Sequence, residues 1–204
     1  MGSLAPLHAN SKMFKYADDV VTVLPISKST SFLCNSLLHE ELEHIKAWCN
    51  NNGLTLNPDK TKVLQISKKE QTTLPLESDS QKLLCDEIKL LGVTYNSWLS
   101  WTSHVSNICK KARQQFYILR KLKPHMEKTT LMTIYTSVIL SALEYCCPLY
   151  IGLDSYNSKR IEAIRKQCHR IICGKGCECN QFEELHQRRK RLALLFFRKN
   201  ACPK

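Results

Sequence analysis

Hydrophobic residues beyond position 100 recur at the spacing of an α-helix. Apolar stripes cover residues 105–122, 131–145 and 161–171, and a last helix is expected over residues 181–199. Residues three and four positions apart lie on one face of a helix, and an apolar face must be buried against another element. The second half of the chain is therefore predicted to form a bundle of four helices.

The first hundred residues have a mixed pattern. Residues 12–24 are typical of a strand, a turn and a second strand, because Phe14 and Tyr16 alternate with lysines before an Asp pair and the β-rich residues 20–24 follow it. An amphipathic helix is predicted over residues 33–48, with Glu41 on its solvent side. Further strands are predicted over residues 61–67 and 88–95. We therefore expect an α+β protein that divides near residue 100 into a mixed part and a helical part.

Basic residues are concentrated in the second half. Residues 1–100 hold 10 Lys/Arg and 11 Asp/Glu, a net charge of −1, whereas residues 101–204 hold 20 Lys/Arg and 7 Asp/Glu, a net charge of +13. Phosphates are bound largely by Lys and Arg, so this imbalance indicates a polyanionic partner, most simply nucleic acid. A solubilising surface and a nuclear address are the alternatives.

Other sequence features limit the partners and the compartment. No run approaches the ~20 apolar residues of a membrane span, so a membrane is not expected as a partner. The N-terminus lacks the basic and then apolar layout of a secretory signal. The eleven cysteines are therefore expected to be reduced thiols. We expect an intracellular protein, either nuclear or cytoplasmic.

The cations best suited to bind nucleic acid lie opposite two of the apolar stripes. They are Lys110, Lys111, Arg113, Lys159, Arg160, Arg165, Lys166 and Arg170. Each alone is typical of a solvated helix face, but the ensemble favours binding. Residues 188–191 (RRKR) have the composition of a nuclear-localisation run, or they form the basic side of a final amphipathic helix.

Asp18 and Asp19 are adjacent carboxylates between two short apolar runs. A tight hairpin with carboxylates at its tip is a suitable holder for Mg²⁺, because the strands are rigid and the hard oxygen ligands suit a hard cation. An ordinary turn is the alternative, because Asp is common in turns. The dipeptide alone favours the turn.

A longer set of motifs resembles a known family. Residues 14–21 (FKYADDVV) resemble the catalytic hairpin of reverse transcriptases, particularly those of non-LTR (LINE-like) retrotransposons. Later segments resemble further parts of that family in the same order: residues 42–62, 89–93, 99–104 and 143–150. The resemblance implies a partial polymerase palm in residues 1–100, a helical thumb in 101–175 and a basic C-terminal helix or tail in 176–204.

The same resemblance implies roles for particular residues. Asp18 and Asp19 would be the catalytic carboxylates that hold Mg²⁺, and Lys60 would protonate departing pyrophosphate; a solvated loop lysine is the alternative for Lys60. The turn made by Lys89, Leu90, Leu91 and Gly92 would resemble the family's primer grip, although any β-turn would look the same. The partner would be an RNA or DNA template–primer duplex.

The resemblance is incomplete at the site that matters for catalysis. The family's third carboxylate comes from an upstream strand, but none of residues 1–17 is Asp or Glu, and the fingers are also missing. We therefore expect an RNA-directed DNA polymerase (nucleotidyltransferase) fragment that is inactive alone. The alternative is a non-enzymatic nucleic-acid-binding or structural protein derived from that fold.

A cysteine-rich segment near the C-terminus raises the question of zinc. Its potential ligands are Cys168, His169, Cys173, Cys177, Cys179 and His186. Zinc favours Cys and His ligands, but no CxxC pair is present. Reduced helix and loop thiols are the favoured interpretation, and sequence alone leaves the zinc site open.

Overall fold

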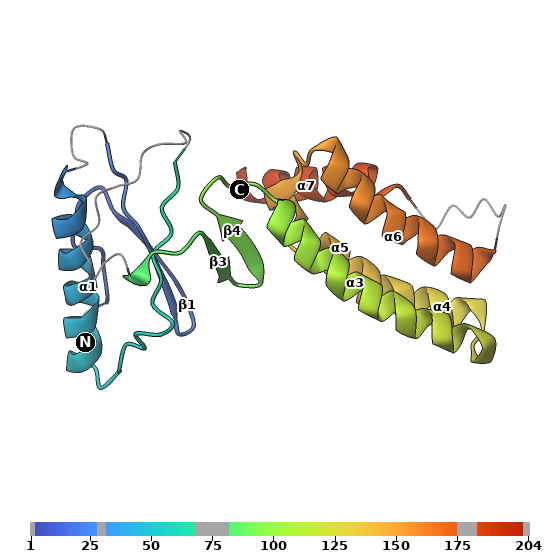
Figure 1. The fold of residues 1–204 in the computed structure, drawn as a ribbon, viewed down its shortest axis with the longest axis horizontal. Coiled ribbons are helices and arrows are strands. Elements are labelled where there is room, and N and C mark those ends of the chain that lie inside the picture. Colours follow the sequence, from blue (N-terminus) through green and yellow to red (C-terminus); the bar gives the residue numbers. More distant parts are fainter. Residues whose placement is uncertain (1–2, 28–31, 68–81, 175–182, 202–204) are drawn as a thin grey trace. The chain divides into compact units, whose positions relative to one another are not determined.

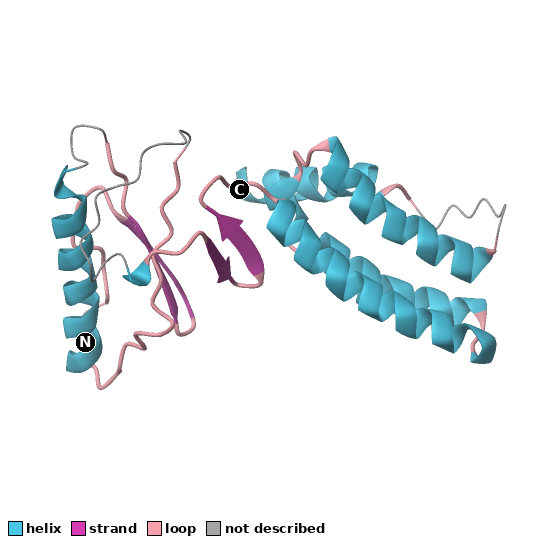
Figure 2. Cartoon of the chain, in the orientation of Figure 1, coloured by secondary structure: helices cyan, strands magenta, loops and turns pink. Residues whose placement is uncertain are grey.

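The computed structural model describes residues 3–27, 32–67, 82–174 and 183–201. The chain divides into two compact units, Met1–Ile88 and Lys89–Lys204, which we call unit 1 and unit 2. Each unit has its own secondary structure, and helices predominate in unit 2 (Figures 1 and 2). None of the helices in the described ranges is both long enough and apolar enough to cross a membrane.

Unit 1 begins with the predicted hairpin. Strands β1 (Lys12–Tyr16) and β2 (Asp19–Val23) pair antiparallel, with Tyr16 opposite Asp19. Two residues connect them, and the first, Ala17, has a positive φ of 52°. A two-residue connection of this kind suits the right-handed twist of the paired strands. Most side chains of the hairpin remain exposed, including Phe14.

Helix α1 (Cys34–Asn51) is the main helix of unit 1. Only Cys34, Glu41 and Ile45 of this helix are buried. Glu41 is 2% exposed, and its carboxylate accepts a hydrogen bond of 3.2 Å from the backbone N–H of Leu7. The prediction that Glu41 faces solvent is therefore wrong. As a charged residue, Glu41 was placed on the solvent face of the helix. The N-terminal segment covers this position and supplies the backbone N–H of Leu7 as a donor to its carboxylate.

The predicted strand over residues 61–67 is also wrong. In the described part of unit 1, this segment forms only an isolated parallel bridge between Val63 and Leu84. The Val63 N–H donates to the Leu83 carbonyl at 2.8 Å, and the Cys85 N–H donates to the Val63 carbonyl at 2.9 Å. Alternating side chains fit a strand, but a strand also needs a partner along its length.

A second hairpin leads into the helices. Strands β3 (Glu87–Leu90) and β4 (Val93–Asn96) form a separate two-stranded sheet. Leu91 and Gly92 make the turn with positive φ values of 47° and 83°. The Tyr145 hydroxyl donates a 2.7 Å hydrogen bond to the Leu91 carbonyl. The two small antiparallel sheets and the helices confirm an α+β protein, whereas nothing in them supports the assignment of palm and thumb.

The helices of unit 2 follow the predicted stripes closely, with one exception. The principal helices are α3 (Thr102–Leu122), α4 (Lys128–Ile134), α5 (Ser141–Glu144), α6 (Ser155–Cys173) and α7 (Leu185–Ala201). Short 3₁₀ segments are η2 (Lys123–His125) and η4 (Cys147–Tyr150). The predicted helix over residues 131–145 is interrupted by a π-helix, η3 (Tyr135–Leu140).

One continuous core holds these helices together. It is built from the apolar faces of α3, α4, η3, α5 and α6, and it includes Val105, Leu119, Ile139 and Ile164. Helix α3 packs along α6, as the pair of long ribbons in Figure 1 shows. The predicted burial of four apolar stripes in a common core is thus found for the first three helices, and α7 adds Leu185.

Polar contacts fix the start of α6. The carboxylate of Asp154 accepts a 2.6 Å hydrogen bond from the backbone N–H of Asn157 and caps the helix. The side-chain amide of Asn157 donates both to Asp154 at 2.8 Å and to the Thr102 hydroxyl at 3.1 Å. Asn157 thereby connects the first turn of α6 to the first turn of α3, which sets how the two helices begin side by side.

An aromatic cluster lies at the same end of unit 2. The ring of His104 meets Tyr150 edge-on, with the ring centroids 5.3 Å apart, and Trp101 lies against both. His104 Nδ1 accepts from the backbone N–H of Thr94 at 3.4 Å, so Nε2 carries the proton of the neutral ring. Burial, together with the nearby charge of Lys111, lowers the pKa of His104. His104 is therefore a neutral core residue.

Candidate nucleic-acid interface

Asp18 and Asp19 lie at the exposed tip of the first hairpin, in the turn and at the start of β2. Among the residues that the structure describes, no group of three or more His, Cys, Asp or Glu side chains is placed to hold a metal ion. Mg²⁺ is commonly bound through one or two carboxylates, with waters and substrate phosphates completing its six oxygen ligands. Magnesium binding by Asp18 and Asp19 therefore stays a prediction, and we derive no chemistry through it.

Lys60 and the 89–92 turn lie in different settings. Lys60 is exposed in a turn whose backbone N–H groups at Asp59 and Lys60 donate to the side-chain oxygen of Asn57. The turn through Lys89, Leu90, Leu91 and Gly92 packs on Tyr145, whose Cε1 atom would lie 3.2 Å from a Cβ added at Gly92. This contact gives the turn a structural role within unit 2.

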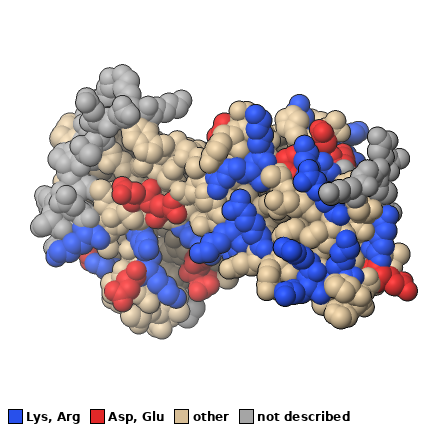
Figure 3. Space-filling model, turned by 45° about the vertical axis from the view of Figure 1, so that its right-hand side comes forward, with Lys and Arg blue, Asp and Glu red and all other residues tan. Residues whose placement is uncertain are grey.

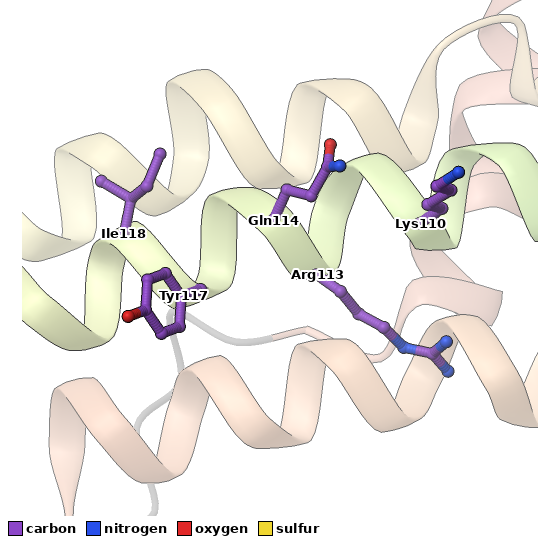
Figure 4. A pocket seen from close by; sticks show the side chains of 5 residues that line it. All are labelled: Lys110, Arg113, Gln114, Tyr117 and Ile118. Carbon is purple, nitrogen blue, oxygen red and sulfur yellow. The ribbon is translucent and has the colours of Figure 1, made fainter.

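The three predicted cations of α3 are all exposed. They are Lys110, Lys111 and Arg113. Lys110 and Arg113 share one side of the helix with Gln114, Tyr117 and Ile118, where the five residues line an open hollow of about 600 Å³ (Figure 4). Gln114, Tyr117 and Ile118 were not predicted from the sequence. Their positions, four, seven and eight residues after Lys110, were the signal that could have identified them.

The predicted cations of α6 divide into two groups. Lys159, Lys166 and Arg170 are exposed. Arg160 is half-buried and donates to the Ser106 hydroxyl at 2.9 Å and to the Asn157 side chain at 3.1 Å. Arg165 is buried and pairs with Glu162 at 2.5 Å. Arg165 is thus held inside the unit and is not presented at the surface for binding.

The basic run at residues 188–191 lies within α7 and is also partly internal. Arg188 pairs with Glu144, and Arg191 pairs with Glu183 at 2.7 Å. Arg189 is 4% exposed, with its guanidinium carbon 6.0 Å from the centroid of the Tyr150 ring. Burial lowers the pKa of Arg189, and the ring face offers the cation a weak electrostatic partner. The run is therefore a structured helix face rather than a free basic peptide.

The cysteine-rich segment is only partly described. Cys168 is fully buried in the core, and burial raises its pKa to about 12. Zinc binds the thiolate, and burial disfavours this charged form of Cys168. Cys173 is half-buried and His186 is exposed. Cys177 and Cys179 lie outside the described residues, so the zinc question stays a prediction for them.

Positive charge gathers on unit 2. Lys and Arg side chains spread over much of the visible surface of this unit in Figure 3, with few acidic side chains among them. The acidic residues are largely used inside the unit: Glu144 pairs with Arg188, Glu162 with Arg165, and Asp154 caps α6. The exposed cations of α3 and α6 are therefore little neutralised by the acidic residues of the unit.

One comparison with known protein families gives a match. Residues 101–141 match the family described as Alkylated DNA repair protein alkB homolog 8, N-terminal. This segment runs from the residue before α3 through α4 and η3, about a fifth of the chain. No curated protein and no solved structure matches the chain.

The family match overturns the resemblance inferred from the motifs. The segment that was assigned to a polymerase thumb matches a family that is not a reverse transcriptase. The identification as a non-LTR retrotransposon reverse transcriptase, with RNA-directed DNA polymerase or nucleotidyltransferase activity, is therefore wrong. The physical reason lies in the motifs themselves. Each is short and consists of residues that hairpins and amphipathic helices commonly use, as the solvated Asp18–Asp19 turn illustrates.

Proposed function

We propose that unit 2 is a nucleic-acid-binding module that holds the phosphate backbone through the exposed cations of α3 and α6. The observation that carries this proposal is a set of exposed cations on two helices that pack together: Lys110, Lys111 and Arg113 of α3 and Lys159, Lys166 and Arg170 of α6. The two helices pack side by side through Arg160 and Asn157, so the cations belong to one rigid framework.

The charge distribution favours a polyanion over a solvated surface. Residues 101–204 hold 20 Lys/Arg and 7 Asp/Glu. Because Glu144 and Glu162 already pair with Arg188 and Arg165, they do not neutralise the outer cations. A surface with this excess attracts phosphates and releases their counterions on binding. The name of the matching family mentions the repair of alkylated DNA, which also favours a nucleic-acid partner.

Binding through phosphate contacts should depend little on the base sequence of the nucleic acid. Phosphate contacts position a protein on its partner, whereas base contacts specify the sequence. The exposed cations are on helix faces that can reach many phosphates, so we expect RNA and DNA strands of different sequence to bind with similar affinity. Affinity should fall as salt rises, with a slope of roughly 0.7–0.9 in the logarithm for each phosphate contacted.

The test is a charge reversal with a matched control. We expect Lys166→Glu with Arg170→Glu to weaken binding of a mixed-sequence oligonucleotide by the full chain at least tenfold at low salt, and to reduce the salt slope. The control, Lys60→Glu with Lys62→Glu, makes the same change of charge at exposed residues of unit 1. Fluorescence anisotropy at several salt concentrations measures both. Equal losses for the two variants, or an affinity that does not depend on salt, would contradict the proposal.

A further inference from the structure

Tyr117 stands in a setting that backbone binding does not explain. Tyr117 is 59% exposed, and the neighbouring Ile118 is 55% exposed. Both line the open hollow of α3, on the opposite side of the helix from the buried Ala112 and Leu119. A solvent-exposed aromatic and aliphatic pair does nothing for the core of unit 2, and such apolar surface inside a polar rim often marks a contact site.

Cations surround this ring. Lys110 and Arg113 lie two turns and one turn before Tyr117 on the same helix, and all three residues line the hollow (Figure 4). Lys121 Nζ lies 5.6 Å from the centroid of the Tyr117 ring. The hollow of about 600 Å³ is open to solvent, so the ring remains accessible beside these positive charges.

An aromatic face next to phosphate-binding cations fits a nucleotide with an exposed base. The ring can stack on the base, and Lys110 or Arg113 can hold the adjoining phosphate. In a duplex the base faces are stacked on each other and cannot reach the ring, whereas an unpaired base can. Gln114, with an amide donor and acceptor in the same hollow, can hydrogen-bond to a base edge.

We propose that the Tyr117 hollow binds an unpaired base, so that unit 2 prefers single-stranded RNA or DNA over a duplex. This inference rests on the proposed function, because the cations of α3 are part of the same surface. It adds a substrate class: strands with accessible bases.

The chain contains a matched control for stacking. Tyr156 of α6 is 66% exposed, and the guanidinium carbon of Arg160 lies 5.4 Å from its ring centroid. Tyr156 therefore shares the exposure and the cation of Tyr117, but it does not line the hollow. Loss of a general surface aromatic and loss of the stacking site can thus be separated.

The experiment compares a fluorescein-labelled single-stranded oligonucleotide with the duplex made from the same strand, at one low salt concentration and with the full chain. We expect Tyr117→Leu to weaken single-strand binding about tenfold and to leave duplex binding within about twofold. Tyr117→Phe retains a stacking ring and should bind like the unsubstituted protein, and Tyr156→Leu should also do so. Unsubstituted protein should bind a strand of abasic nucleotides no more tightly than the duplex.

Each contrary result has its own meaning. Salt-dependent binding that is unchanged in Tyr117→Leu, or equal loss in Tyr117→Leu and Tyr156→Leu, overturns the stacking site and leaves the proposed function standing. Tight binding of the abasic strand by the unsubstituted protein overturns it without any substitution. Absence of binding to either nucleic acid at low salt overturns the proposed function together with this inference.

Discussion

Gly92 is subject to two separate constraints in the turn between β3 and β4. Its φ of 83° lies in the left-handed region, and a Cβ at this position would approach Tyr145 Cε1 at 3.2 Å. Left-handed backbone costs a non-glycine residue about 1–2 kcal/mol, and the contact adds to this cost. We therefore expect Gly92→Ala to lower the free energy of unfolding of unit 2 by more than ~1 kcal/mol. Amide hydrogen exchange of the unit 2 helices measures the loss.

Gly53 is the control for this prediction. Its φ of 69° is also positive, but an added Cβ would have no atom within 4 Å. Gly53→Ala in unit 1 should therefore show only the conformational cost. A loss for Gly92→Ala no larger than the loss for Gly53→Ala would show that the contact with Tyr145 yields without cost.

Single charged residues were the hardest to place from sequence. Glu and Arg are residue types that usually lie at the surface, yet Glu41, Arg165 and Arg189 are buried. Their partners come from distant segments or from within the helix: the Leu7 backbone for Glu41, Glu162 for Arg165 and the Tyr150 ring for Arg189. Hydrophobic periodicity reports which face of a helix is apolar, and it carries no information on a tertiary partner that allows a charge to be buried.

Helix α6 depends on its cap, and the cap should make its first turn sensitive to pH. Hydrogen bonds from the backbone N–H and then the side-chain amide of Asn157 lower the pKa of Asp154 below its ordinary value of 3.8. Because the pKa of Asp154 is lower in the folded state, the ionised carboxylate stabilises the capped helix at any pH above the ordinary pKa. This stabilisation is lost as the pH falls through the lower pKa of the folded state. We expect the amides of Asn157 and Ser158, which donate to Asp154, to lose protection in that acidic range.

Asp154→Asn is the matched variant for this test. Asparagine also accepts a hydrogen bond at the N-cap, but it does not titrate there. Its first turn should keep the same protection as the pH is lowered from neutrality through the acidic range. NMR measurement of amide exchange against pH compares the two proteins. The same acid response in both would place its origin in another group.

Whole elements were predicted with varying success for identifiable reasons. The stripes of α3 and α6 are long and regular, so the sequence was sufficient to place both helices. The segment over residues 131–145 has an equally apolar stripe but contains the π-helix η3. There the hydroxyls of Ser137 and Ser141 donate to backbone carbonyls, Thr133 and Ser137 respectively, four residues earlier. Side-chain bonds of this kind compete with regular helical geometry.

At the scale of the whole molecule, the candidate site was predictable only in part. The excess of cations in residues 101–204 identified the half of the chain and the helices that carry the surface. The charge excess could not show that Arg160 and Arg165 bond to other residues of unit 2. Arg160 donates to Ser106 only because α3 packs against α6, and Arg165 pairs with Glu162. The family interpretation failed for a different reason, since short motifs specify local shapes that unrelated folds share.

The two units should unfold separately. The hydrophobic core cluster lies entirely within unit 2, from Val105 to Leu185, whereas the buried apolar side chains in the described part of unit 1 are Leu4, Cys34 and Ile45. Stability differs between regions when their buried apolar contacts differ, so unit 1 should exchange its amides faster than the helices of unit 2. Domains with separate cores also respond separately to substitutions in those cores.

Ile164→Ala tests this separation. Ile164 is fully enclosed in the core of unit 2, and truncating such a side chain removes buried methyl groups and leaves a cavity. The cost should be about 2–5 kcal/mol. We expect this loss in the amide exchange of α3 and α6, with no change in the amides of α1. Ile45→Ala, the matched truncation in unit 1, should show the reverse. If each substitution lowered the protection of both units by the same free energy, the chain would unfold as one cooperative domain, and the basic helical unit could not be treated as a separate binding module.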